Sequence, residues 1–140
     1  MNFLTAFGSI VGDKPHFVVE ADKHPVRLFI VLVGETSKGR KGTSWGYIKR
    51  IFGSIEPGWE QNIKTVLSSG EGLIWAVRDE IKKKKPIKQN GLIAGYEEEI
   101  IDEGIKDKRL LVIESEFAST LVVISREGNT LSSVIRESWD

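Results

Sequence analysis

The chain has 140 residues, and its 20 Lys and Arg residues balance 20 Asp and Glu residues, so its formal net charge is zero. A chain of this length can form one domain with a buried core, and the balanced charge excludes a global field that would attract nucleic acid or membrane. The absence of cysteine excludes disulfides, thiolate nucleophiles and cysteine-based zinc sites, and it is typical of a protein from a reducing cytoplasm.

The first part of the chain predicts a short helix and two strands. Apolar residues in "NFLTAFGSIVG" recur at helical spacing, without the basic segment that begins a secretory signal. The runs 16–21 and 26–34 predict paired strands, and the second is expected to be central because it is apolar on both faces. No run approaches the roughly 20 apolar residues of a membrane span, so we expect a cytoplasmic protein with no membrane partner.

The middle of the chain predicts two helices with a short strand between them. "TSWGYIKRIF" has apolar residues at helical spacing directly after a glycine-rich loop, and "NIKTVLS" predicts the strand. The apolar stripe in "SSGEGLIWAVRDEIKKKK" predicts a second helix that ends before Pro86. Ser68 and Glu71 fit a capping box at its start, although Glu71 is also a candidate base near a bound phosphate.

The last part of the chain predicts a hairpin, a strand and two helices. Asn90-Gly91 lies between extended runs, which is a strong hairpin signal. The run Lys82–Lys85 before it is interpreted as a solvated helix end, with contact to a nucleic acid backbone as the alternative. "RLLVIESEF" predicts a buried strand that ends in acids, and two helices separated by Gly128-Asn129 follow.

The segment "VLVGETSKGRKGTSWG" is similar to a phosphate-binding loop with its lysine one place late. The consensus G-x-x-x-x-G-K-[ST] is met at Gly34 and Gly39, but Arg40 occupies the lysine position and Lys41 the hydroxyl position. A strand before the loop and a helix after it supply the setting in which backbone N–H groups bind phosphate. The alternative is an ordinary solvent-exposed loop that binds no ligand.

Two registers of the loop are open. In one, Arg40 contacts the phosphates; in the other, the loop is one residue longer, so that Lys41 reaches the β/γ-phosphates and Thr43 or Ser44 holds Mg²⁺. The second is favoured because a compact ammonium fits beside a metal ion better than a planar guanidinium does. The candidate nucleotide-binding residues are Gly34, Thr36, Ser37, Gly39, Arg40, Lys41, Gly42, Thr43 and Ser44.

The run "LLVIE" is an apolar strand followed by an acid, which is the pattern of a Walker B motif. Glu114 is the candidate Mg²⁺ ligand, partly through water, together with Thr43. Glu116 lies two residues further on and is the candidate general base that polarises the attacking water. The alternative is a strand that ends at the solvent-exposed surface, where acidic residues are common. Without the glycine-rich loop, the two acids alone do not indicate a nucleotide site.

Other short patterns are discounted. "GTSWG" matches the G-x-S-x-G elbow of serine hydrolases, but no histidine follows His24 to act as the base of Ser44. His16 and His24 are too few for a metal site by themselves. Trp45 and Trp75 fall on apolar helical faces and are expected in the core rather than against nucleic acid bases.

Taken in order, "LFIVLVGETSKGRKGTSW", "LSSGEGLIWAVRD", "RLLVIESEFASTL" and "REGNTLSSVIRESWD" make the chain similar to a P-loop ATPase family of phages, plasmids and integrated elements. Members of that family are often joined to primase-polymerase domains. The resemblance implies a partial RecA-like α/β core of replicative-helicase type, with a central sheet flanked by helices and a β-hairpin insertion. It also implies that residues 1–140 are the amino-terminal part of a larger ATPase domain.

The expected function is therefore that of a Mg-ATP-binding ATPase domain in a DNA replication protein of a mobile element. ATP and Mg²⁺ are the implied cofactors, and DNA, further copies of the chain or a primase-polymerase protein are the implied partners. Two alternatives stay open. One is a non-hydrolysing remnant that binds nucleotide or a partner, and the other is a nucleic-acid-binding module that uses the lysine run and the hairpin.

Overall fold

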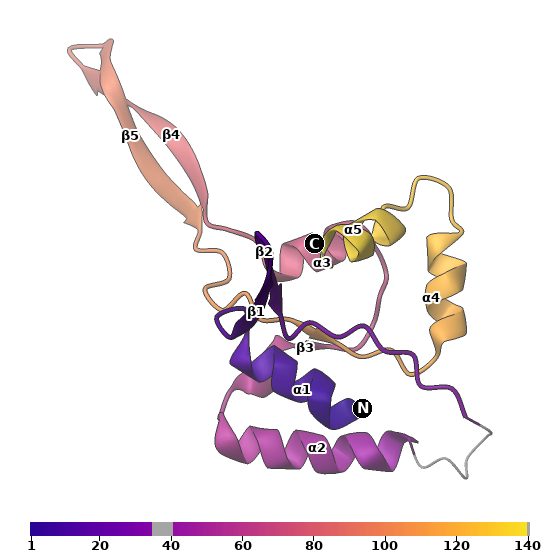
Figure 1. Ribbon diagram of the computed structural model, residues 1–140. Coiled ribbons are helices and arrows are strands. Elements are labelled where there is room, and N and C mark those ends of the chain that lie inside the picture. The colour runs from indigo at the N-terminus through magenta and orange to yellow at the C-terminus, as the bar shows by residue number, and fades with distance from the viewer. Residues whose placement is uncertain (35–40, 140) are drawn as a thin grey trace.

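The computed structural model describes residues 1–34 and 41–139, and these form five α-helices, one short 3-10 helix and three separate two-stranded sheets (Figure 1). The mixed α/β composition confirms the prediction, but within these residues no central parallel sheet is formed. The elements are α1 (Asn2–Val11), β1 (His16–Val19), β2 (Asp22–Pro25), α2 (Lys41–Ile55), η2 (Trp59–Asn62), β3 (Ile63–Lys64), α3 (Gly70–Ala76), β4 (Ile81–Gln89), β5 (Leu92–Asp102), β6 (Leu111–Val112), α4 (Phe117–Ile124) and α5 (Leu131–Glu137).

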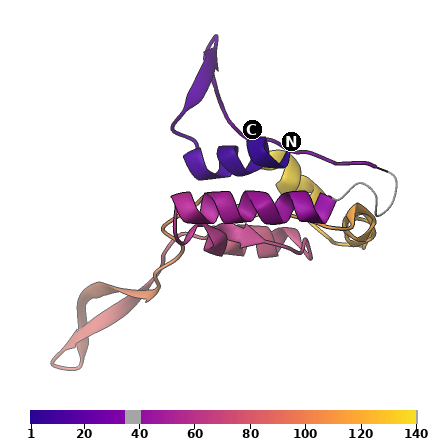
Figure 2. The ribbon, with the colours of Figure 1, turned by 90° about the horizontal axis from the view of Figure 1, so that it is seen from below.

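The main core lies where α1, α2, η2 and β6 meet, and Figures 1 and 2 both show α1 lying along α2. Trp59 is almost completely buried, and its ring centroid lies 5.7 Å from that of Phe52 and 6.3 Å from that of Trp45. The indole Nε1 of Trp59 donates a hydrogen bond to Ser9 Oγ at 3.2 Å, which satisfies the polar end of the ring. The buried residues of this cluster are Ala6, Phe52, Trp59 and Leu111.

A second packing contact joins α3 to α5. A Cβ atom at Gly70 would lie 2.4 Å from Thr130 Oγ1 and 2.8 Å from Val134 Cγ2, so only glycine allows this approach. Leu131, the first residue of α5, is fully buried. The chain before α5 turns at Gly128, which has a φ of 74°. These observations confirm the predicted pair of carboxyl-terminal helices separated at Gly128-Asn129.

The predicted hairpin is confirmed, and it is longer than expected. Gln89 pairs with Leu92 across a two-residue turn in which Asn90 and Gly91 have φ angles of 53° and 78°. Positive φ at both turn residues matches the right-handed twist of the flanking strands. Figures 1 and 2 show that β4 and β5 extend as an arm away from the helices.

The helix predicted up to Pro86 is wrong after Ala76. Lys82–Lys85 lie in β4 instead of at a helix end, and Lys83, Lys84 and Lys85 stand opposite Glu99, Glu98 and Glu97. Lysine has a low intrinsic β-propensity, but opposite charges on facing strand positions stabilise a sheet. The apolar stripe that suggested one long helix combined residues of α3 with Ile81, which begins β4.

The prediction of a central strand over residues 26–34 is also wrong. β1 pairs with β2 through a tight turn, and the segment 26–34 belongs to no sheet. Arg27 donates to the carbonyl oxygens of Ser138 and Trp139, each at 3.4 Å, and the Phe29 ring lies edge-on to Trp139 at 5.1 Å. The start of the segment is therefore held against the end of α5.

The two remaining strand predictions, "NIKTVLS" and "RLLVIESEF", are confirmed only as a short parallel pair. Ile63 of β3 pairs with Leu111 of β6, and Lys64 pairs with Val112. The helix predicted after the glycine-rich loop is confirmed as α2, which continues to Ile55. Among the helices of the described residues, none combines the length and apolarity that a membrane span requires.

Candidate functional site

The described part of the candidate phosphate loop consists of its two ends. Gly34 is exposed, and among the residues that the structure describes, a Cβ atom at Gly34 or Gly42 would meet nothing within 4 Å. Gly42 and Thr43 are exposed in the first turn of α2. Ser44 Oγ accepts a hydrogen bond from Asn2 Nδ2 at 3.3 Å, so this hydroxyl contacts α1. Outside the described residues lie Thr36, Ser37, Gly39, Arg40 and the side chain of Lys41.

Glu114 and Glu116 lie between the end of β6 and the start of α4. The half-buried Glu114 carboxylate accepts long hydrogen bonds from the backbone N–H groups of Leu67 and Glu116, each at 3.4 Å. Glu116 is exposed and occupies the N-cap position of α4 without a side-chain capping hydrogen bond. Each carboxylate has four acceptor positions, so both retain capacity for a hydrated cation or a water molecule.

The parallel pairing of β3 with β6 explains why Leu67 and Glu114 meet. Parallel strands have their carboxyl ends at the same edge, and ligands of α/β proteins bind at that edge. Within residues 1–34 and 41–139, no hydrogen bond or ion pair joins Glu114 or Glu116 to Gly42 or Thr43. The structure therefore places the two acids together at a strand end, and the first turn of α2 is a separate part of the candidate site.

Glu71 has a different partner from the one predicted. The N-cap of α3 is Ser69, whose Oγ accepts a hydrogen bond from Gly72 N at 3.0 Å, so the capping box of Ser68 and Glu71 is wrong by one residue. Thr130 Oγ1 donates to the Glu71 carboxylate at 2.6 Å. This hydrogen bond is the main cause of a lowered pKa of Glu71, which keeps the group ionised.

Sequence reasoning missed a charged cluster at the edge of the main core. Arg109 donates to Asp107 through Nε at 2.9 Å and to the carbonyl oxygen of Ile10 at 2.6 Å, and it forms an ion pair with Glu56. These bonds lower the pKa of Asp107 far below its usual range and raise the pKa of Arg109. The partners come from α1, from the turn after α2 and from the chain before β6, so no local pattern marks the cluster.

A second cluster fixes the base of the hairpin arm. The Arg78 guanidinium donates to both oxygens of the Asp102 carboxylate, from Nε to Oδ1 at 3.1 Å and to Oδ2 at 3.2 Å, and from Nη2 to Oδ2 at 2.9 Å. Asp102 also accepts from Gly104 N at 2.7 Å, and the hydrogen bonds from Arg78 and Gly104 lower its pKa. Lys108 Nζ binds the carbonyl oxygens of Val77 and Arg78 at 2.9 and 2.7 Å. These contacts tie the two ends of the arm to the residues that precede β4 and follow β5.

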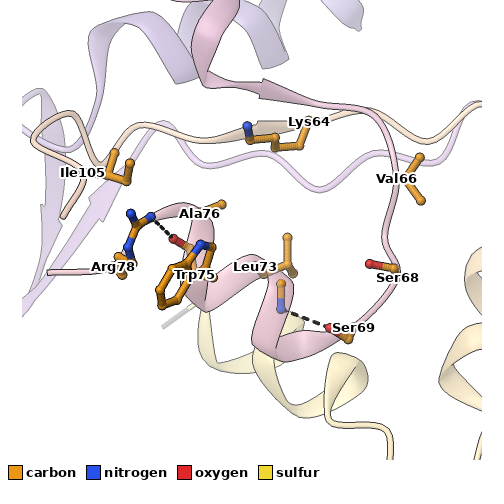
Figure 3. A pocket seen from close by; sticks show the side chains of 10 residues that line it. Lys64, Val66, Ser68, Ser69, Leu73, Trp75, Ala76, Arg78 and Ile105 are labelled. Carbon is orange, nitrogen blue, oxygen red and sulfur yellow. Dashed lines mark hydrogen bonds between the residues drawn. The ribbon is translucent and has the colours of Figure 1, made fainter. Parts of the chain in front are cut away.

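A solvent-open pocket lies between β3 and α3, and its volume is about 310 Å³ (Figure 3). Lys64 lines it from the strand side, Ser68 from the connecting segment, and Leu73 and Trp75 from α3. The Trp75 ring is half exposed, and the Arg78 guanidinium lies 4.0 Å from its centroid. The prediction that Trp75 lies in the core is therefore wrong, whereas Trp45 packs against the core as expected.

The two histidines lie on the exposed β1–β2 hairpin, where His24 pairs with Phe17. In the part of the chain that the structure describes, no group of three or more His, Cys, Asp or Glu side chains is placed to hold a metal ion. Comparison of the chain with protein-family models, curated proteins and solved structures found no match.

Proposed function

We propose that this chain binds Mg-ATP as a P-loop ATPase domain of a mobile-element DNA replication protein. The observation that carries the proposal is that the glycine-rich stretch runs directly into α2, a helix of 15 residues that begins at Lys41. The N-terminus of a helix presents free backbone N–H groups and a partial positive charge, which favour bound phosphate. Among the described residues, nothing lies within 4 Å of a Cβ atom built at Gly42.

The acidic strand end supports the proposed metal site. Glu114 is half-buried, and within the described residues its carboxylate accepts two hydrogen bonds of 3.4 Å, so it suits a Mg²⁺ ion that keeps part of its water shell. The metal ion, when bound, neutralises charge on the β- and γ-phosphates. The chain's own residues position it, with Thr43 supplying a hydroxyl from α2 and Glu114 a carboxylate from the end of β6.

The lysine run gives less support to the nucleic-acid-binding alternative than its sequence suggests. Three of its lysines stand directly opposite glutamates, and Lys82 forms an ion pair with Glu80 at 2.8 Å. Neighbouring carboxylates reduce the positive potential that attracts a phosphate backbone. The arm is therefore a mixed-charge surface rather than a basic one.

Affinity for ATP in the presence of Mg²⁺, measured by calorimetry, tests the proposed site. Lys41→Ala should abolish detectable binding, whereas Arg40→Ala should weaken it about tenfold, as expected for the loss of one charged hydrogen bond. Lys23→Ala, on the exposed β1–β2 hairpin, is the matched control and should bind like the wild type. If Arg40→Ala abolishes binding and Lys41→Ala only weakens it, the register in which Arg40 contacts the phosphates is right. If neither substitution changes the affinity for ATP, the proposed site is refuted.

Steady-state phosphate release tests the proposed division of the two acids. Glu116→Gln should retain Mg-ATP binding and lose turnover, because a water-polarising carboxylate acts on the reaction and not on the ligand. Glu114→Gln should weaken binding in Mg²⁺ and leave metal-free binding unchanged. A Glu116→Gln variant that loses nucleotide as severely as Glu114→Gln would show that the roles are assigned wrongly, and Glu71 would then be the next candidate base.

A further inference from the structure

The pocket between β3 and α3 has a chemical character that the proposed ATP site does not use. Its volume of about 310 Å³ is at the lower end of the roughly 300–1,000 Å³ typical of small-molecule sites. Figure 3 shows Lys64 above the pocket, Ser68 at one end and the α3 residues Leu73 and Trp75 below. The lining thus combines an apolar floor, an aromatic ring, hydroxyl groups and a cation.

The charges around the pocket favour an anion. Within the described residues, the Lys64 ammonium forms no hydrogen bond or ion pair, and no acidic residue lines the pocket. Arg78 also lines it, but its charge is neutralised by the ion pair with Asp102. Glu71 is engaged by Thr130 of α5. The pocket therefore carries one positive charge that is not compensated locally.

Hydrogen-bonding groups lie at the end of the pocket where α3 begins. The Ser69 hydroxyl caps α3 through Gly72 N, whereas Ser68 Oγ forms no hydrogen bond within the described residues. Both hydroxyl groups are close to Gly72, since a Cβ atom there would lie 3.3 Å from Ser69 Oγ and 3.7 Å from Ser68 Oγ. A ligand oxygen at this end can accept a hydrogen bond from Ser68 without disturbing the cap.

We propose that this pocket binds one nucleotide unit, with the base against Trp75 and the apolar floor and the phosphate held by Lys64 and Ser68. Proteins bind single-stranded nucleotides without reading their sequence by combining positive charge near the phosphates with aromatic rings on which the bases stack, and the pocket offers one group of each kind. The half-exposed Trp75 ring supplies the stacking surface, and Arg78 holds it in place from one side. The nucleotide unit comes either from a free mononucleotide or from a single strand.

Binding is measured by nuclear magnetic resonance titration of the Lys41→Ala protein, so that the phosphate loop cannot contribute. The ligands are thymidine monophosphate, a ten-residue oligothymidylate and ribose 5-phosphate. Resonances of Lys64, Ser68 and Trp75 should shift with at least one of the first two ligands. Ribose 5-phosphate should bind roughly tenfold more weakly, because it has no base to stack. Tighter binding of the oligonucleotide would identify a single strand as the source, and equal binding per site would identify a free nucleotide.

Substitutions in the same background test the roles of the lining residues. Lys64→Ala should lower the affinity about tenfold and Trp75→Phe should lower it severalfold, while Lys83→Ala, on the hairpin arm, should leave it unchanged. Because Lys64 and Trp75 are exposed, these variants should fold normally. The proposal is wrong if none of the three ligands shifts the pocket resonances, if ribose 5-phosphate binds as well as the nucleotides do, or if Lys83→Ala weakens binding as much as Lys64→Ala.

Discussion

Arg109 joins three separate parts of the chain through one guanidinium group. Its guanidinium contacts the carbonyl end of α1, the carboxylate of Glu56 and the carboxylate of Asp107. Asn62 donates to the same Asp107 carboxylate at 2.6 Å, so η2 joins the cluster as well. Charged hydrogen bonds of this kind stabilise the ionised forms of both partners, which is why the two pKa values move apart.

The lowered pKa of Asp107 predicts a specific loss of stability in acid. Because the folded pKa lies below the unfolded value of about 3.9, the unfolded state binds more protons between the two values. The contribution of Asp107 is therefore complete well above pH 4 and declines as the pH falls below it. Asp107→Asn should lower the free energy of unfolding by about 1 kcal/mol at pH 7, a value reduced for solvent exposure, and by less at pH 3. Urea unfolding at the two pH values measures this.

The control for this prediction is Asp13→Asn, since Asp13 is exposed and forms no hydrogen bond or ion pair among the described residues. It should change the unfolding free energy little at either pH. An equal deficit of Asp107→Asn at pH 7 and pH 3 would mean that the Asp107 charge does not stabilise the fold.

At the scale of elements, the contact between α3 and α5 depends on a missing side chain. Gly70 begins α3 at the point where Thr130 and Val134 approach it, and its Cβ position is already occupied. A glycine in the first turn of a helix costs backbone entropy, so its presence here is explained by packing rather than by helix propensity. The approach also brings Thr130 within hydrogen-bonding distance of Glu71.

Two glycine-to-alanine variants separate packing from propensity. Gly70→Ala should destabilise the protein by about 1–3 kcal/mol, because the added methyl group forces α3 and α5 apart. Gly46→Ala, in the open middle of α2, should stabilise it by about 0.5–1 kcal/mol, because alanine favours the helix. Thermal and urea unfolding measure both values. If Gly70→Ala is as stable as the wild type or more stable, the close contact at Gly70 does not control this packing.

Elements set by local chemistry were predicted well, and those set by distant partners were not. Asn90-Gly91 encodes its own turn through positive φ angles, and α1, α2, α4 and α5 follow from short periodic stretches with clear ends. The segment 26–34 has the composition of a central strand, but a strand forms only where another strand pairs with it. Composition alone does not identify that partner.

The candidate site shows the same division. The placing of Glu114 and Glu116 at a strand end follows from the switch between apolar and acidic residues, and the start of α2 follows from the glycine-rich stretch. The contact between Glu114 and Leu67, the partner of Glu71 and the Arg109 cluster all join residues more than forty positions apart. Such contacts depend on how the elements pack, and a single amino-acid sequence carries no direct signal of them.

At the scale of the whole molecule, the segment 26–34 is an apolar stretch that no sheet covers. Phe29, Val31 and Val33 are 52%, 57% and 92% exposed, respectively. Within the described residues, the one backbone hydrogen bond of this segment outside regular elements is Arg27 N to the Pro25 carbonyl oxygen at 2.8 Å. Runs of six or seven apolar residues with high β-propensity and free backbone groups readily pair with other chains.

This surface predicts that the protein associates with itself through the segment 26–34. Analytical ultracentrifugation at increasing concentration should show growing oligomers, because pairing would cover the exposed side chains and satisfy the free backbone groups. Val31→Lys should weaken the association by roughly tenfold or more, since a charge buried without a partner at the interface opposes it.

Leu92→Lys is the matched control, because Leu92 is 76% exposed at the tip of the hairpin arm, away from this segment (Figure 1). Its sedimentation should follow that of the wild type. If Leu92→Lys is monomeric while Val31→Lys still associates, the contact between chains lies on the arm. If the wild-type protein stays monomeric at high concentration, the exposed segment does not pair between chains.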